Sequence, residues 1–293
     1  MPLSNITNAQ RAEVLTQALP YIQKYNGKIV VIKYGGNAMI NDELKHQVME
    51  DIILLRLVGV KVVLVHGGGP EITDTLKKIG KESVFVDGLR VTDKETADVV
   101  QMVLAGKINK SLVNLLGTFG GKAVGISGID GHLIEAETKD ERLGFVGKIN
   151  NVNVEPIMDL LAHKYIPVVS TVGCDFEGNV YNINADTAAA YIAGALGAEC
   201  LITMTDIAGI LKDKDNPESL IPLIDLNDAK ELFRDGTISG GMIPKVECCI
   251  EAINRGVKKV FIMDGRVPHS LLVETLTDEG AGTMVIEDKN NEL

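Results

Sequence analysis

The chain has 293 residues, with 29 lysines and arginines against 40 aspartates and glutamates, so its formal net charge is −11 at pH 7. This balance excludes a sequence-independent nucleic-acid binder, which needs a cationic face, but it allows a small anion to bind in a local cationic pocket. The hydrophobic content of 45% excludes a wholly disordered chain, and the length predicts one large domain or two lobes.

Residues 5–25 predict an amphipathic helix ahead of the first strand. Thr7 and Gln10 have the spacing of a capping box, and Pro20 is expected to kink the helix because it lacks a backbone N–H. The helix is expected to end at Asn26 and Gly27, so we interpret residues 1–27 as a helical arm. The pattern leaves open whether this arm packs on its own body or reaches a neighbouring subunit.

After the arm, short β-type runs alternate with helical stretches, which predicts an α/β fold. We expect a three-layer αβα sandwich, in which helices cover both faces of a mostly parallel central sheet. The pattern restarts near residues 194–199, which suggests one lobe over residues 28–196 and a second over residues 197–293. Strands are predicted at 29–34, 61–66, 122–127, 132–138, 145–152, 166–171, 199–205, 258–263 and 283–287, and helices at 42–59, 71–79, 95–116, 154–163, 186–196, 241–255 and 270–276.

The first ten residues lack the cationic and then apolar pattern of a secretion signal, and every apolar run is too short to span a bilayer. We therefore expect a cytoplasmic protein that does not contact a membrane. The five histidines show no metal-binding spacing, so no metal site built from side chains is expected. The cysteines form no CxxC pair and are expected to be reduced core thiols: Cys174, Cys200, Cys248 and Cys249.

Two glycine clusters follow consecutive predicted strands, Gly35-Gly36 after the first and Gly67-Gly68-Gly69 after the second. In open parallel sheets, ligands bind beyond the carboxyl ends of the strands, and glycine lets backbone N–H groups approach an oxyanion. Two clusters therefore favour an anion site over a pair of tight turns. The chain contains neither GxxxxGK[ST] nor GxGxxG in these loops, so the common nucleotide fingerprints are absent.

Three charged residues stand in unusual places. Lys33 lies in an otherwise apolar strand, which predicts an anionic partner. Lys245 follows the glycine turn SGGMIP at a helix start, where a cation opposes the helix dipole, and Asp186 lies in YNINADTAAA. Taken singly, an edge-strand lysine and two solvated first-turn residues explain them equally well.

Six segments occur in one order along the chain: KYGGNAM at 33–39, VHGGGPEI at 65–72, GLRVTD at 88–93, YNINADTAAA at 181–190, TDIAGIL at 205–211 and SGGMIPKV at 239–246. Together they resemble the amino acid kinase family over nearly the whole chain. The N-terminal helix and HSLLVETLTDEGAGTM at 269–284 resemble its arginine-inhibited, hexameric branch, which acts on N-acetyl-L-glutamate. Small departures at Ile129 and at Ser170-Thr171 are expected to lie apart from the site.

The resemblance implies the amino acid kinase fold and transfer of the ATP γ-phosphoryl group to the γ-carboxylate of N-acetyl-L-glutamate in arginine biosynthesis. Mg²⁺ would bridge the β- and γ-phosphates. By resemblance, Lys33 and Lys245 stabilise the transferring group, and Asp186 holds both lysines. The implied acceptor-binding residues are Gly68, Gly69, Arg90, Asn182 and Asn184, and the implied nucleotide- or phosphate-binding residues are Gly35, Gly36, Thr205, Asp206, Gly209, Gly240 and Gly241.

The resemblance also implies regulation. The arm would serve oligomerisation or regulation, residues 28–196 would bind the acceptor, and residues 197–293 would bind the nucleotide. A homohexamer built as a trimer of dimers is expected, and a regulatory protein partner stays open. An L-arginine effector would contact Tyr21, His269, Glu274 and Gly282.

Three alternatives compete with this interpretation. A sister kinase acting on aspartate, glutamate or UMP would share the glycine loops and the lysines, but GLRVTD together with YNINADT disfavours it. A non-catalytic regulator would lose Lys33, Asp186 and Lys245, which are all present. A nicotinamide oxidoreductase would share only the α/β pattern, and the missing fingerprint disfavours it.

Overall fold

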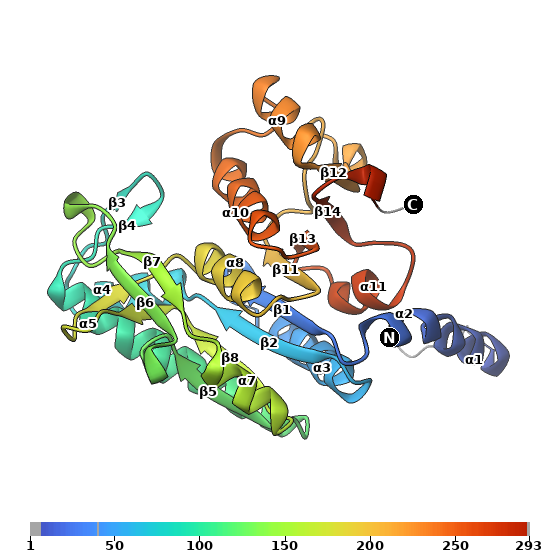
Figure 1. Ribbon diagram of the computed structural model, residues 1–293, viewed down its shortest axis with the longest axis horizontal. Coiled ribbons are helices and arrows are strands. Elements are labelled where there is room, and N and C mark those ends of the chain that lie inside the picture. Colours follow the sequence, from blue (N-terminus) through green and yellow to red (C-terminus); the bar gives the residue numbers. More distant parts are fainter. Residues whose placement is uncertain (1–6, 40, 292–293) are drawn as a thin grey trace.

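A computed structural model describes residues 7–39 and 41–291, and an eight-stranded sheet runs through it (Figure 1). The strand order is β12-β14-β13-β11-β1-β2-β8-β5, and every neighbouring pair is parallel except β13 with β14. The mostly parallel sheet is thereby confirmed. Its strands are β1 (Ile29–Tyr34), β2 (Lys61–His66), β5 (Ala123–Ser127), β8 (Ile166–Ser170), β11 (Cys200–Thr205), β12 (Leu223–Asp225), β13 (Lys259–Asp264) and β14 (Gly282–Ile286).

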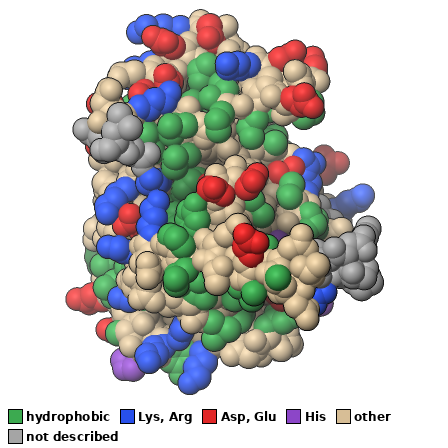
Figure 2. Space-filling model, turned by 90° about the vertical axis from the view of Figure 1, so that its right-hand side faces the viewer, with side chains coloured by type: hydrophobic (Ala, Val, Ile, Leu, Met, Phe, Trp, Pro, Cys, Tyr) green, Lys and Arg blue, Asp and Glu red, His purple; other side chains and the backbone are tan. Residues whose placement is uncertain are grey.

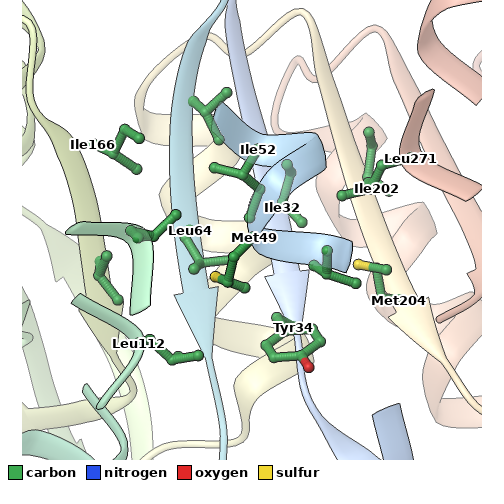
Figure 3. Packing of buried hydrophobic residues seen from close by; sticks show 14 of the residues in the cluster. Ile32, Tyr34, Met49, Ile52, Leu64, Leu112, Ile166, Ile202, Met204 and Leu271 are labelled. Atoms are coloured by element: carbon green, nitrogen blue, oxygen red, sulfur yellow. The ribbon is translucent and has the colours of Figure 1, made fainter. Parts of the chain in front are cut away.

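The central strands are apolar on both faces because helices cover both. In β1, Ile32 and Tyr34 belong to one hydrophobic cluster and Val31 to the other, as the twofold alternation of a strand requires (Figure 3). The first cluster takes residues from α3 (Asp42–Leu57), α4 (Gly69–Lys78), α5 (Lys94–Gln101), α6 (Asn109–Thr118) and α11 (Ser270–Leu276). The second takes residues from α7 (Glu155–Ala162), α8 (Ala185–Ala195), α9 (Leu226–Arg234) and α10 (Ile243–Asn254), which confirms the three-layer sandwich.

The N-terminal arm consists of two helices, α1 (Asn8–Gln17) and α2 (Leu19–Tyr25), while the expected start at residue 5 lies outside the described residues. The capping box is confirmed, because Thr7 Oγ1 accepts a hydrogen bond from Gln10 N at 3.2 Å and Gln10 Oε1 accepts one from Thr7 N at 2.9 Å. The predicted kink is also confirmed, with Pro20 in the first turn of α2. Helix α2 packs on α11, whereas α1 buries no residue and extends beside the body (Figure 1).

The predicted helix over residues 95–116 is wrong in one respect. It begins as α5, continues as a π-helical segment η2 (Met102–Ile108) and ends as α6. The predicted helix at 241–255 likewise starts with the 3₁₀ turn η6 (Gly240–Met242) ahead of α10. The other 3₁₀ turns are η1 (Gly36–Met39), η3 (Asp130–His132), η4 (Glu141–Leu143), η5 (Pro217–Ser219) and η7 (Lys289–Asn291).

The predicted β excursion forms a second sheet of order β10-β9-β6-β7. Its strands β6 (Ile134–Thr138) and β7 (Gly147–Val152) were expected, but β9 (Val172–Cys174) and β10 (Val180–Asn182) were not. The hairpin of β3 (Phe85–Val86) and β4 (Leu89–Arg90), strand β12 and helix α9 were missed as well. Strands of two or three residues are too short to show a period, so the sequence pattern does not reveal them.

The surface agrees with the charge composition. Lysine and arginine side chains are interspersed with acidic and apolar ones on the face that Figure 2 shows. Within the described ranges, no helix combines the length and the apolar character that crossing a membrane requires.

Gly128, which precedes β6, allows a close approach of two strands. A Cβ atom on it would lie 2.2 Å from the carbonyl oxygen of Val172 and 2.7 Å from Ile134 Cβ. We expect Gly128→Ala to lower the free energy of unfolding by about 1–3 kcal/mol, measured by urea denaturation. The control Gly117→Ala, in α6 with no heavy atom within 4 Å, should raise it by about 0.5–1 kcal/mol. Equal stabilities of the two variants would contradict this packing.

Candidate functional site

A cavity of about 370 Å³ opens beyond the carboxyl ends of β1 and β2. The parallel register sets Tyr34 beside His66, and Gly67 N donates a hydrogen bond to the carbonyl oxygen of Tyr34 at 3.2 Å. The two glycine clusters therefore lie side by side at one edge of the sheet. Ligands bind at this edge in open parallel sheets. The cavity is lined by the predicted residues Lys33, Gly35, Gly36, Gly68, Gly69, Arg90, Asn182, Asn184, Asp186, Asp206 and Lys245.

Lys33 and Asp186 form an ion pair in this cavity. Lys33 is only 6% exposed, and its Nζ lies 3.0 Å from Asp186 Oδ1. Burial raises the pKa of Asp186, but the charges of Lys33 and Lys245 outweigh this effect and hold the pKa below its ordinary value. Asp186 is therefore ionised, and it is the anionic partner expected for a lysine in an apolar strand.

Local sequence positions Asp186 at the start of α8. Asn184 is the N-cap, and its Oδ1 accepts hydrogen bonds from the backbone N–H groups of Asp186 and Thr187, both at 3.0 Å. An acidic residue in the first turn also suits the helix dipole. The N-cap hydrogen bonds of α8 thus position Asp186 independently of the two lysines.

Lys245 approaches Asp186 from a different element. It is the third residue of α10, which packs against α8, and it lines the same cavity. Its charge lowers the pKa of Asp186, although no ion pair within 4 Å joins them. The carboxylate supplies the compensation that a cation near a helix N-terminus needs.

The second glycine cluster forms the start of α4. Gly68 is the N-cap, and because it has no side chain the first N–H groups of the helix lack a side-chain cap. A Cβ on Gly68 would lie 2.1 Å from Ile108 Cδ1 and 2.8 Å from Leu104 Cδ2, so the loop packs directly on the π-helical segment. Uncapped N–H groups at a helix N-terminus favour an anion.

Arg90 lies at the end of β4 and is 6% exposed. Its Nη2 donates hydrogen bonds to the carbonyl oxygen of Gly69 at 3.0 Å and to Thr73 Oγ1 at 2.8 Å, and its Nη1 donates to Ser83 Oγ. The guanidinium carbon lies 4.7 Å from the centre of the Phe85 ring. Burial lowers the pKa of Arg90. The guanidinium is thus held in one orientation at the cavity wall.

The predicted nucleotide residues do not all line the cavity. Gly241 lines a neighbouring groove of about 690 Å³ that also reaches Lys245. Thr205 and Gly209 are buried and line neither the cavity nor the groove. Thr205 Oγ1 accepts a hydrogen bond from Ile207 N at 3.0 Å, and Gly209 packs on Thr283. Gly240 is exposed in η6 and lines neither.

The four predicted effector residues lie around α11. Tyr21 is on α2, which packs against α11. Glu274 Oε2 accepts a hydrogen bond from Ala281 N at 2.6 Å, next to Gly282 in β14. Burial raises the pKa of Glu274, against the backbone hydrogen bonds that lower it. His269 faces another element, because its Nδ1 lies 2.6 Å from Asp51 Oδ1 in α3.

Several cavity residues were not predicted. Thr171, which we expected to lie apart from the site, lines the cavity together with Asn182. Gly67 follows from its place in the glycine cluster, but Phe85 and Leu89 come from a hairpin that no sequence pattern indicated. Among the residues that the structure describes, no three His, Cys, Asp or Glu side chains gather as a metal site.

Comparison with known proteins agrees with this geometry. Residues 28–264 match the model of the amino acid kinase family. The chain is 59% identical over 288 residues to the acetylglutamate kinase of Brachyspira hyodysenteriae, covering 98% of this chain and all of that one. It is 53% identical over 279 residues to the acetylglutamate kinase of Nostoc sp., covering 95% and 94%.

Solved structures share the fold. The N-acetylglutamate synthase of Neisseria gonorrhoeae superposes with a TM-score of 0.82 at 24% identity, covering 94% of this chain and 63% of that one. The carbamate kinase of Giardia lamblia gives a TM-score of 0.64 at 19% identity, covering 89% and 99%. With the family model matched over most of its length and its glycine loops, lysines and Asp186 gathered at one sheet edge, the chain belongs to the amino acid kinase family.

Proposed function

We propose that this protein transfers the γ-phosphoryl group of ATP to the γ-carboxylate of N-acetyl-L-glutamate, as a step of arginine biosynthesis. The observation that carries the proposal is the convergence of Lys33 and Lys245 on Asp186 between two glycine loops. The choice of acceptor is supported by the relatives named acetylglutamate kinase and by Arg90 at the cavity wall. A planar guanidinium suits bidentate binding of the acceptor's α-carboxylate.

The chemistry needs charge stabilisation more than proton transfer. A γ-carboxylate oxygen of the acceptor forms a bond to the γ-phosphorus, and the bond from that phosphorus to the bridging oxygen of ADP breaks. The nucleophile is already an anion at neutral pH, so no general base is required. The barrier comes from bringing two anions together and spreading charge over the transferring oxygens. Lys33 and Lys245 supply positive charge there, while Asp186 acts as a positioning residue.

The backbone and the metal complete this arrangement. N–H groups of Gly35, Gly36, Gly68 and Gly69 hold oxygens of the phosphoryl group and the acceptor. Mg²⁺ would enter with ATP, would be held mostly by phosphate oxygens and water, and would offset negative charge on the phosphates. Asn182 and Asn184 contact the acceptor's other polar groups.

The two lobes bind different substrates. Residues 28–196 bind the acceptor, and residues 197–293 bind the nucleotide through residues 205–209 and 239–245. Arg90 and Asn182 in the first lobe, and Asp206 and Lys245 in the second, face one cavity, which supports this division.

Regulation by L-arginine and assembly into a hexamer are further parts of the proposal. The contact of α2 with α11, which places Tyr21 on the helix beside Glu274, supports an effector site there. Helix α1 buries no residue, and its Val14 and Leu15 are 61% and 75% exposed, so it is available to contact another subunit. Control by a regulatory protein stays a prediction.

The first test identifies the acceptor. The protein is incubated with MgATP, hydroxylamine and either N-acetyl-L-glutamate, L-glutamate, L-aspartate or UMP, and ADP release is measured beside hydroxamate formation. We expect hydroxamate with N-acetyl-L-glutamate, because hydroxylamine traps the acyl phosphate, and no signal when EDTA removes Mg²⁺. Hydroxamate from another acceptor alone, or ADP release with UMP alone, would assign a sister activity instead.

The second test concerns the lysines. Lys33→Ala and Lys245→Ala should each lower kcat by about 10²–10³-fold, because each removes a charge that acts on the developing transition state. Lys258→Ala is a control, since Lys258 pairs with Glu199 and lies on the surface. Steady-state rates close to wild type in both cleft variants would reject their roles.

The third test concerns regulation. Removing residues 1–17 deletes α1 and leaves α2 with its buried Tyr25. We expect L-arginine to raise the apparent KM for N-acetyl-L-glutamate in the full chain, and the truncation to reduce both this shift and the particle mass measured by light scattering. A truncated protein with unchanged mass and unchanged arginine response would contradict the role of α1.

A further inference from the structure

One buried histidine stands directly behind the glycine loop. His66 ends β2, its side chain is fully buried, and its Nδ1 lies 2.9 Å from the carbonyl oxygen of Gly67. Its Nε2 lies 3.1 Å from Nδ2 of Asn109, the first residue of α6. A carbonyl oxygen only accepts hydrogen bonds, so the first contact requires a proton on Nδ1.

The orientation of the Asn109 amide shows that Nε2 of His66 carries no proton. Its Nδ2 donates to the carbonyl oxygen of Val168 at 2.9 Å and lies 3.3 Å from that of Ile126, and its Oδ1 accepts from Lys110 Nζ at 3.1 Å, so one of its two protons is left for His66 Nε2. A flipped amide would turn its oxygen toward two carbonyls and its NH₂ toward an ammonium group, so the orientation is determined. The NH₂ group therefore faces His66 Nε2, which must offer a lone pair.

His66 is thus a neutral imidazole with its proton on Nδ1. Burial lowers the pKa of His66 to about 4, against the hydrogen bond to Gly67, and the charge of Lys110 adds to this effect. Neutral imidazole in water prefers the proton on Nε2. The protein therefore selects the less common tautomer, as buried partners of a histidine can do.

The hydrogen bond from His66 to Gly67 affects the site because one peptide plane joins the carbonyl of Gly67 to the N–H of Gly68. The carbonyl of Gly67 and the N–H of Gly68 belong to the same trans peptide and point in opposite directions. A donor that holds the carbonyl also fixes the direction of the N–H. The π-helical segment before Asn109 also packs on this loop, where Ile108 and Leu104 leave no space for a side chain on Gly68.

We propose that His66 and Asn109 are positioning residues, in which the Asn109 amide selects the imidazole tautomer and the imidazole aims the N–H group of Gly68, in the Gly68–Gly69 turn, at the acceptor. The placement of the acceptor at this turn rests on the proposed function. The tautomer and its hydrogen bonds do not, so they can be tested separately. The π-helical segment ends at Ile108, the residue directly before Asn109.

The spectroscopic test uses the full-length protein labelled with [15N]histidine. The His66 signals are assigned by their absence in His66→Gln, and the ring nitrogens are read between pH 6 and 8. We expect a protonated Nδ1 and an aprotic Nε2 throughout this range. In Asn109→Ala the ring should become a mixture of tautomers, whereas Asn114→Ala, at an exposed position of the same helix, should leave it unchanged. A wild-type ring protonated on Nε2, or on both nitrogens, would overturn the proposal.

The kinetic test compares two substitutions at His66. The amide nitrogen of asparagine takes the place of Nδ1 and can still donate to Gly67, whereas the amide of glutamine reaches only the place of Nε2. We expect His66→Gln to lower kcat/KM for the acceptor by about 10–100-fold and His66→Asn by less than about threefold, with KM for MgATP changed less than about twofold in both. Glutamine is closer to histidine in volume, so a cavity does not explain this order.

The outcomes separate the two proposals. Equal losses in the two variants, or a larger loss in His66→Asn, would assign His66 a packing role only. Absence of any phosphorylation of N-acetyl-L-glutamate by the wild-type protein would reject the proposed function. The 15N spectra would still decide the tautomer in that case.

Discussion

The ion pair between Lys33 and Asp186 is the constraint on which the rest of the site depends. Desolvating a charged group costs on the order of several kcal/mol, so a lysine at the end of a buried strand requires an anion within contact distance. That anion belongs to α8, which must therefore begin directly over the end of β1. The charge of Asp186 also offsets that of Lys245, so that two lysines can line the same cavity.

This arrangement reconciles an acidic chain with anionic ligands. A net charge of −11 repels polyanions at long range, yet a few cations held in a partly desolvated cleft act at short range, where screening is weak. The glycine loops add N–H groups that carry no net charge. The directions of these N–H groups depend on the residues packed behind the loops. Behind the second loop these residues are His66, Asn109 and the π-helical segment.

Much of this fold and site could be predicted from the chain alone, because the features concerned are local. Alternation of apolar runs marked the parallel sheet, glycines after β1 and β2 marked the ligand edge, and Lys33 stood out by its apolar surroundings. The sequence pattern did not reveal the hairpin that carries Arg90 or the strand β9 next to Thr171, since strands of two or three residues show no period. It also did not reveal the change to a π-helix after Gln101, since a π-helical segment has no characteristic composition.

The sequence by itself determined the layer order, the positions of the glycine turns and the family to which the chain belongs, because these depend on residue type and spacing along the chain. Only the tertiary structure decided which charges meet. Asp186 lies far from Lys33 and Lys245 in sequence, and Asn109 far from His66. Such pairs arise where strands and helices of separate segments pack together. The protonation of Asp186 follows from that packing because burial and neighbouring charge set it, and the tautomer of His66 follows because its hydrogen bonds to Gly67 and Asn109 set it.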